Sequence, residues 1–443
     1  MAIELSSLTF TEQDDIVPAS GVEEILNTGV ANTLAGNDRI TGTKETTTDT
    51  PYQQIFSSIF NSGTLNTADG DDIITGTIST TEDSPAYYNH AGIRNIGSIS
   101  TGEGNDKITG SGVYGLVNSF TITTDNGNDT ISGTGEGGAA GLYSQGNINS
   151  GDGNDIITGT NTGGNGYGIF NGFGLPDEVA RTTLDTGDGN DTITGIGAYA
   201  IINYATINTG EGADSIIGDA SSNNGRGEGI INVGTINTGK GQDSIISQGK
   251  IINYGGLYLG EGNDSITADV DLPNRAIENF NFIGTGEGSD IITSTGVIYN
   301  QGVIETGNGN DSIIVNGGVD DNGTRYGIYN NGGAINMGDG NDSIIANEGF
   351  ESGPNSSGAW FLGEGDDYIK GFGSGDFYGG NGFDTLELTP GSYTVGIWGE
   401  GDTSVIFTSG NSLMITSEFE KLKAGSTIYD FTSLTAGQII IVS

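Results

Sequence analysis

Cysteine is absent from this 443-residue sequence, and proline (7), histidine (1) and basic residues (13 Lys and Arg) are scarce. Without cysteine, disulfides cannot hold the fold, which fits either a cytosolic protein or an extracellular one that is stabilised in another way. The 13 basic residues stand against 57 acidic ones, giving a net charge of −44, so nucleic acid is a poor partner. No run approaches the ~18 apolar residues that a bilayer span needs, so we expect no transmembrane segment.

Glycine, by contrast, is abundant, with 81 residues. A thick helical core is excluded, because each helical glycine costs about 1 kcal/mol relative to alanine. Collagen is excluded as well, since proline is scarce and glycine does not recur at every third position. The composition leaves either a disordered acidic chain or a glycine-rich repeat fold.

An internal repeat decides between them. The block T-G-x-G-N-D-x-I-x-G recurs along most of the chain, with glycine two residues before the aspartate in every copy. Glycine also stands four residues before the aspartate, except where Leu34, Ala68 or Asp125 replaces it. The motif aspartates are Asp38, Asp72, Asp106, Asp129, Asp155, Asp191, Asp214, Asp243, Asp264, Asp290, Asp311, Asp342, Asp367 and Asp384.

A second landmark, I-x-N-x-G-x-I, precedes most blocks. Its polar residues are Asn27, Asn61, Asn95, Asn118, Ser144, Asn171, Asn203, Asn232, Asn253, Asn279, Asn300 and Asn330. The distance to the next aspartate is usually 11 residues, whereas the return distance varies from 10 to 23. One rigid and one tolerant half per unit predict an all-β parallel β-helix of about 13–14 coils with a C-terminal β cap.

The asparagine series is interpreted as a structural ladder at one corner of the helix. Tyr204, Tyr254, Tyr299 and Tyr329 flank it, as packing or surface aromatics or as a carbohydrate-stacking face. His90, the single histidine, is expected in a solvated insertion.

The glycine-rich turn is the candidate metal site. Its glycines allow positive φ, so that carbonyl groups converge, and its aspartate adds a carboxylate. Oxygen ligands of this kind suit Ca²⁺. The predicted ligands are the fourteen aspartates, Asp376, and Gly102, Gly104, Gly151, Gly153, Gly187, Gly189, Gly210, Gly212, Gly260, Gly262, Gly286, Gly288, Gly307, Gly309, Gly338, Gly340, Gly363, Gly365, Gly380 and Gly382. The alternative is a tight glycine turn without metal.

Repulsion within the stack favours an ion. Carboxylates ~5 Å apart repel by about 3 kcal/mol at an effective dielectric constant of 20. Further acids lie three residues before many motif aspartates: Asp69, Glu103, Asp152, Asp188, Glu211, Glu261, Glu287, Asp339 and Glu364. We therefore expect several Ca²⁺ ions in one column, and folding that depends on them.

The stretch GGNGFDTLE from Gly379 resembles the nonapeptide GGxGxDxUx of hemolysin-type (RTX) calcium-binding repeats. Asp367, Asp376 and Asp384 are 9 and 8 residues apart, so 363–388 looks like a short two-sided RTX β-roll. The other copies, one motif per longer coil, are similar to one-sided RTX-like β-helices, some of which are ice-binding adhesin domains. The resemblance covers roughly residues 25–388.

The predicted organisation is an N-terminal cap (1–24), calcium-binding β-helix repeats (25–362), the RTX-like roll (363–388) and a C-terminal β cap (389–443). Alternating apolar residues after residue 388 predict antiparallel hairpins. This tail also looks like the C-terminal region of RTX proteins, which implies a type I secretion signal. Residues 1–24 lack a cleavable signal pattern, so we expect an extracellular or cell-surface protein exported without one.

The expected function is that of a secreted, non-enzymatic protein with a structural, surface-coat, filament-forming or adhesive role. A homo-oligomer or end-to-end filament would follow from near-identical coils. One alternative is ligand binding to a cell-surface glycan or ice, although the exposed turn position is mostly acidic rather than Thr or Asn. Another is a polysaccharide lyase or epimerase, which the scattered Arg94, Arg181, Arg226, Arg275 and Arg325 do not favour.

Overall fold

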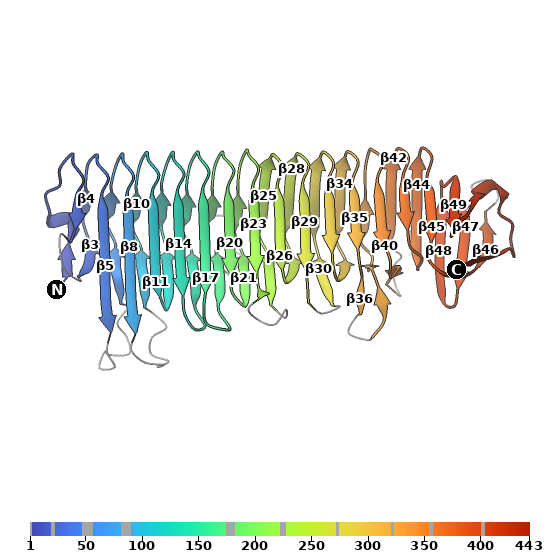
Figure 1. Ribbon diagram of the computed structural model, residues 1–443, viewed down its shortest axis with the longest axis horizontal. Coiled ribbons are helices and arrows are strands. Elements are labelled where there is room, and N and C mark those ends of the chain that lie inside the picture. Colours follow the sequence, from blue (N-terminus) through green and yellow to red (C-terminus); the bar gives the residue numbers. More distant parts are fainter. Residues whose placement is uncertain are drawn as a thin grey trace. The chain divides into compact units, whose positions relative to one another are not determined.

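The computed structural model describes residues 2–18, 23–46, 56–80, 90–173, 182–221, 227–271, 274–319, 323–353, 358–399 and 404–443. The chain divides into two compact units, residues 1–239 and 240–443. In each unit, short parallel strands of successive coils lie side by side (Figure 1). The predicted all-β parallel β-helix is thereby confirmed.

Each coil of the first unit contributes strands to three sheets. Sheet A ends at the asparagine landmark and holds β1 (Ala2–Glu4), β3 (Glu24–Asn27), β6 (Ser57–Asn61), β9 (Ala91–Asn95), β12 (Tyr114–Asn118), β15 (Ala140–Ser144), β18 (Tyr167–Asn171), β21 (Tyr199–Asn203) and β24 (Glu228–Asn232). Sheet C precedes the glycine turn and holds β4 (Val30–Asn32), β7 (Thr64–Asn66), β10 (Ser98–Ser100), β13 (Thr121–Thr123), β16 (Asn147–Asn149), β19 (Thr183–Asp185), β22 (Thr206–Asn208) and β25 (Thr235–Lys240). Sheet B follows the motif aspartate and holds β2 (Ile16–Val17), β5 (Arg39–Thr46), β8 (Ile73–Thr80), β11 (Lys107–Gly112), β14 (Thr130–Gly135), β17 (Ile156–Asn161), β20 (Thr192–Ile196) and β23 (Ser215–Asp219).

The second unit repeats this plan. Its sheet A holds β27 (Lys250–Asn253), β30 (Arg275–Asn279), β33 (Val297–Asn300), β38 (Ile328–Asn330) and β41 (Phe350–Ser352). Its sheet C holds β28 (Gly256–Glu261), β31 (Phe282–Glu287), β34 (Val303–Asn308), β39 (Ala334–Asn336), β42 (Ala359–Glu364) and β44 (Gly375–Asn381). Its sheet B holds β26 (Ser244–Gln248), β29 (Ser265–Asp269), β32 (Ile291–Ser294), β35 (Ser312–Val315), β40 (Ser343–Ala346), β43 (Tyr368–Lys370) and β45 (Thr385–Leu388).

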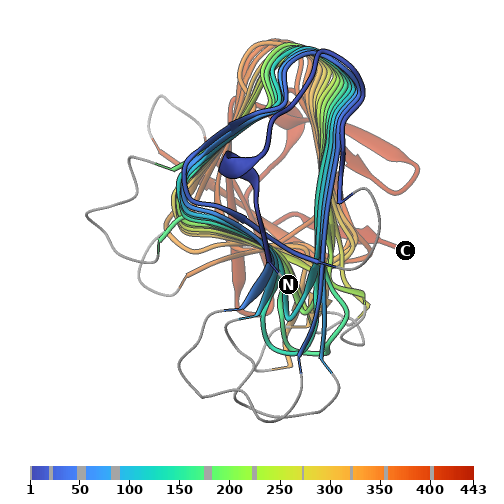
Figure 2. The ribbon, with the colours of Figure 1, turned by 90° about the vertical axis from the view of Figure 1, so that its left-hand side faces the viewer.

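The core is a set of inward-facing rows of aliphatic side chains. Strands alternate inward and outward residues, so in β13 Ile122 is fully buried while Thr121 and Thr123 face outward. Figure 2 looks along the stack and shows the coils of the first unit lying over one another. The register aligns equivalent isoleucines, such as Ile108 with Ile131, so each row is continuous, as the sequence predicted.

Residues 2–18 form a further coil, because β1 pairs with β3 and β2 with β5 in parallel. A short 3₁₀ helix, η1 (Leu5–Ser7), connects them, and Leu5 is buried. The predicted cap thus extends the repeat itself.

The C-terminal part leaves the coil pattern. Strands β46 (Gly391–Trp398), β47 (Ser404–Ser409), β48 (Ser412–Ser417) and β51 (Ile439–Val442) pair antiparallel, as do β49 (Lys421–Ala424) and β50 (Thr427–Asp430). β48 and β49 join β44 and β45 in parallel, and the 3₁₀ helix η4 (Phe431–Ser433) follows β50. A small antiparallel pair, β36 (Gly318–Val319) and β37 (Arg325–Tyr326), lies within the second unit. The domain boundaries proposed from the sequence stay predictions.

None of the helices in the described part of the chain has the length and hydropathy needed to span a bilayer.

Candidate metal-binding turns

The glycine turn has the backbone that the sequence predicts. Gly102 and Gly104 have φ of 87° and 147°, and the matching glycines of the other copies are similar. A Cβ atom at Gly104 would lie 2.0 Å from the carbonyl oxygen of Gly70 in the preceding coil. At this inner position, only glycine therefore permits the turns to stack this closely, with the carbonyl group of one coil against the α-carbon of the next.

The three copies that lack the outer glycine adopt the same conformation. Leu34, Ala68 and Asp125 have φ of 69°, 64° and 59°, a region that non-glycine residues rarely occupy. Stacking on the neighbouring coils therefore fixes the turn geometry, and the left-handed conformation of these three residues destabilises the folded state relative to glycine.

The motif aspartates form a ladder in each unit. Each side chain is at most 2% exposed. Within each unit, the Oδ1 of one aspartate accepts the backbone N–H of the aspartate one coil earlier. In the first unit, for example, Asp106 N–H donates to Asp129 Oδ1 at 2.7 Å. In the second unit, Asp264 N–H donates to Asp290 Oδ1 at 2.7 Å. One carboxylate oxygen per coil is thus used for backbone hydrogen bonding.

The second carboxylate oxygen, Oδ2, differs from Oδ1 in having no hydrogen-bond partner in most copies. Among the described residues, Oδ2 is buried without a hydrogen-bond partner in Asp38, Asp72, Asp106, Asp129, Asp155, Asp191, Asp264, Asp290, Asp311, Asp342, Asp367 and Asp384. A buried carboxylate oxygen left in this state is costly unless a proton or a cation satisfies it.

Burial dominates the electrostatics of this column. It is the main reason that the pKa of Asp72, Asp264 and Asp342 rises to about 7, and the neighbouring carboxylates act in the same direction with a smaller effect. Hydrogen bonding at these carboxylates, including that from the stacked backbone, lowers the pKa but has less effect than burial. Without a counter-ion, these groups would hold protons near neutral pH.

The ligand set fits a hard cation only if the backbone participates. Within the described residues, no group of three or more His, Cys, Asp or Glu side chains could hold a metal. An ion at the turn would therefore combine one carboxylate per coil with stacked glycine carbonyl groups. Calcium accepts such mixed oxygen ligands in flexible geometry, whereas zinc and other softer metals favour nitrogen and sulfur.

Asp376 does not join either ladder. It lies in β44, paired with Ala359 in β42, rather than at a glycine turn. The second column expected of a two-sided roll at 363–388 thus gains no carboxylate from Asp376.

The ladders extend beyond the fourteen predicted copies. Asp15 N–H donates to Asp38 Oδ1 at 2.8 Å, and Asp384 N–H donates to Glu420 Oε2 at 2.7 Å. Glu418, which takes the place of the inner glycine, has φ of 63°. The sequence analysis missed both ends because neither carries glycine; the spacing from acid to aliphatic residue, Asp15 to Val17 and Glu420 to Leu422, was the available signal.

Two further side chains of the block have roles that sequence reasoning did not assign. The residue before the aspartate caps the following coil; Asn105 Oδ1, for instance, accepts the N–H of Asn128 at 3.0 Å. The threonine five residues before the aspartate is buried, and Thr67 Oγ1 donates to the carbonyl of Thr101 at 3.3 Å. Both hydrogen bonds therefore link the turns of neighbouring coils, one from the residue just before the aspartate and one from the threonine five residues before it.

The acids three residues before the motif aspartates face outward instead. Glu103 accepts the amide of Asn126 at 3.1 Å, and Glu287 that of Asn308 at 2.8 Å. Alternation of acid and amide along this row relieves repulsion outside the turn.

The asparagine landmark is confirmed as a structural ladder. Asn61 Nδ2 donates to Asn95 Oδ1 at 2.7 Å and to the carbonyl of Ser98 at 2.9 Å, and Asn253 donates to Asn279 at 2.9 Å. All these side chains are fully buried.

The prediction that His90 is solvated is wrong. His90 is 2% exposed and lies 5.2 Å from the ring of Phe56, measured between centroids. Burial lowers the pKa of His90. His90 is buried because it directly precedes Ala91, the first residue of β9, and Ala91 is itself buried.

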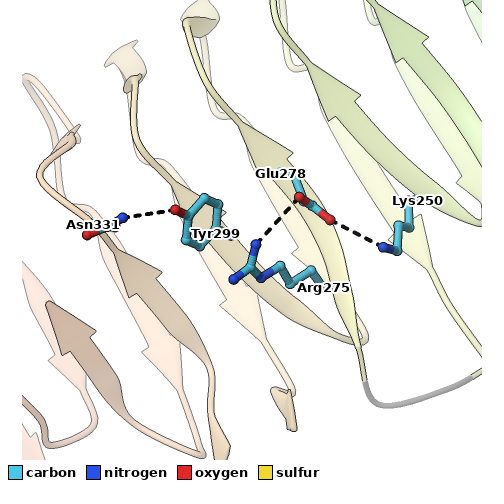
Figure 3. Close-up of polar contacts among 5 residues, drawn as sticks. All are labelled: Lys250, Arg275, Glu278, Tyr299 and Asn331. Carbon is cyan, nitrogen blue, oxygen red and sulfur yellow. Dashed lines mark hydrogen bonds and ion pairs between the residues drawn. The ribbon is translucent and has the colours of Figure 1, made fainter. Parts of the chain in front are cut away.

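Basic residues that the sequence scatters meet in the second unit. Figure 3 shows Lys250 and Arg275 beside Glu278, with Nζ–Oε1 and Nη1–Oε2 distances of 3.2 and 3.6 Å. The guanidinium of Arg275 lies 3.8 Å from the ring centroid of Tyr299, whose hydroxyl accepts the amide of Asn331 at 2.9 Å. Both cations are engaged by one carboxylate, so this network ties β27, β30 and β33 together and resembles a structural contact more than a reactive centre.

The sequence matches no protein-family profile and no curated protein sequence. Among solved structures, the chain is similar to a hyperactive, Ca²⁺-dependent, β-helical antifreeze protein from an Antarctic bacterium. The two share 19% identity over 78% of this chain and 82% of that one, with a TM-score of 0.44. The case for calcium in this chain rests on its own turns.

Proposed function

We propose that this protein is a calcium-stabilised, non-enzymatic β-helix with a structural or adhesive role outside the cell. The observation that supports it is the column of buried aspartate Oδ2 atoms without hydrogen-bond partners. Calcium at the turns would satisfy these atoms and offset the repulsion between coils. Millimolar calcium, the range in which extracellular modules typically bind, would then complete folding after export. Export by a type I route and filament formation are further parts of this proposal.

A near-isosteric substitution tests the metal. In Asp129→Asn, the amide oxygen can still accept the N–H of Asp106, while an NH₂ group replaces the unbonded Oδ2. We expect the variant to unfold at a lower temperature than the wild type in 5 mM calcium. At a low calcium concentration, at which the wild type only just stays folded, the order should reverse, because the variant buries no charge at this position. Thermal unfolding followed by circular dichroism measures both.

The alternative, a glycine turn without metal, predicts no reversal. In that case calcium leaves the unfolding temperature of both proteins unchanged, and the proposal is wrong. Asn128→Ala serves as a matched control, since it removes a cap next to the column but no carboxylate. Its effect on the unfolding temperature should be the same at both calcium concentrations.

A second candidate function, ice binding, is favoured by sheet C of the first unit. Thr64 and Asn66 of β7, and Thr206 and Asn208 of β22, face outward on either side of a buried aliphatic residue. Equivalent positions lie in register on neighbouring strands, giving two outward rows in which successive side chains are about 4.8 Å apart. The rows carry mainly hydroxyl and amide groups, with the carboxylate of Asp185 among them. The sequence analysis disfavoured ice binding because the exposed turn position is mostly acidic, but the Thr and Asn rows lie on the sheet face next to that turn. Thermal hysteresis in millimolar calcium tests the candidate, and its absence would reject it.

A further inference from the structure

A groove crosses the outward face of sheet C in the second unit. It has a volume of about 380 Å³ and runs over β28, β31 and β34. Its lining includes the aromatic residues Tyr258 and Phe282 and the polar residues Glu287, Glu305 and Asn308. A cavity of this size with aromatic surface and a few polar groups is typical of a small-ligand subsite.

Two glycines leave the space that the rings of Tyr258 and Phe282 occupy. A Cβ at Gly256 would lie 2.4 Å from the ring of Tyr258, and one at Gly284 would lie 2.6 Å from the ring of Phe282. The ring centroids are 5.2 Å apart, with planes inclined by 31°. Tyr258 is 43% exposed, so the pair offers a broad apolar surface to solvent.

A second platform lies further along the same face. Phe361 of β42 and Tyr378 of β44 are stacked, with centroids 5.0 Å apart, and are 41% and 36% exposed. The register places Tyr258, Glu305 and Phe361 in one row across the sheet, about 19 Å from end to end. Polar side chains thus separate two aromatic platforms.

We propose that this row is a binding site for a neutral polysaccharide chain. A sugar ring has an apolar C–H face, which covers a flat aromatic ring favourably, and a rim of hydroxyl groups that carboxylate and amide side chains can bind. Two platforms with hydrogen-bonding groups between them match a chain of several sugars. The acids of the groove, Glu287 and Glu305, and the net charge of −44 disfavour a polyanion. This inference is independent of the metal.

Affinity gel electrophoresis of the folded protein in calcium tests the site. The probes are hydroxyethylcellulose and galactomannan as neutral polysaccharides, and alginate as an anionic one. We expect at least one neutral polysaccharide to retard the protein and alginate to have no effect. Tyr258→Ala and Phe361→Ala should each weaken binding about tenfold, the loss typical of removing one stacking ring.

Tyr254→Ala is the matched control. Tyr254 is 51% exposed and stacks on Phe280 at 4.7 Å, yet it lies outside the row. Its affinity should equal that of the wild type, and the unfolding temperature in calcium shows that each variant is folded. The proposal is overturned if neither neutral polysaccharide retards the protein, if Tyr254→Ala loses as much affinity, or if alginate binds equally well.

Discussion

The two units share their turns but differ on the face beside them. The outward positions of sheet C hold Thr206 and Asn208 in the first unit, where the second has Tyr258, Phe282 and Glu305. The buried residue between them is aliphatic in both β22 and β28. A β-helix therefore separates the residues that hold the coils together from those that meet solvent, and the latter can change without altering the fold.

Chelation should have the largest effect, and it tests whether the turns of the two units are truly alike. We expect excess EGTA at pH 8 to abolish the β-sheet circular dichroism of the whole chain, and added calcium to restore it. Hydrogen exchange resolves the units. Protection lost from one unit alone would show that only one column binds metal.

Acidification should partly replace calcium in both units. Burial raises the pKa of Asp72 and Asp342 from 3.8 to about 7, so the folded chain without metal binds more protons than the unfolded one. This stabilisation is complete below about pH 4 and is lost as the pH rises through 7. The chelated protein should thus regain β-sheet signal between pH 8 and 5, whereas a signal that falls in this window would contradict the buried column.

Replacing one asparagine of the asparagine ladder should lower the free energy of unfolding by less than metal removal does, but by more than a surface substitution does. In the first unit, Asn203 Nδ2 donates to Asn232 Oδ1 and to the carbonyl of Thr235, both at 2.9 Å. Asn203→Leu leaves buried partners unsatisfied, at a cost of about 3 kcal/mol. Asn279→Leu, which removes the equivalent bonds of the second unit, should give a similar loss by urea unfolding. Unequal losses would show that the ladders differ.

The smallest expected effect concerns strain at the outer-glycine position of the turn, where Leu34, Ala68 and Asp125 of the first unit replace glycine. Asp125 occupies φ of 59° at a position where most copies have glycine. Asp125→Gly should raise the free energy of unfolding by about 1 kcal/mol. The opposite kind of change in the next coil, Gly151→Ala, should lower the free energy of unfolding, since the new Cβ would lie 1.7 Å from the carbonyl oxygen of Asp125. Urea unfolding in calcium measures both, and a stabilising Gly151→Ala would contradict the strain.

The sequence by itself determined the coil. The phase between Asn232 and the turn glycines, together with alternating isoleucines, is local information, because a parallel stack places identical positions over one another. The fold class, the asparagine ladder, the positive-φ turns and the buried aliphatic rows all follow from that phase.

The tertiary structure alone decided which oxygen of each aspartate is engaged, where His90 lies and how far the ladder extends. Asp15 and Glu420 carry no glycine signal, and only pairing with neighbouring coils makes them part of the ladder. Likewise, Tyr258 and Phe361 are 103 residues apart in the chain, and only the register brings them into one row. The physical reason is that stacking creates neighbours between coils, and spacing within one coil does not encode them.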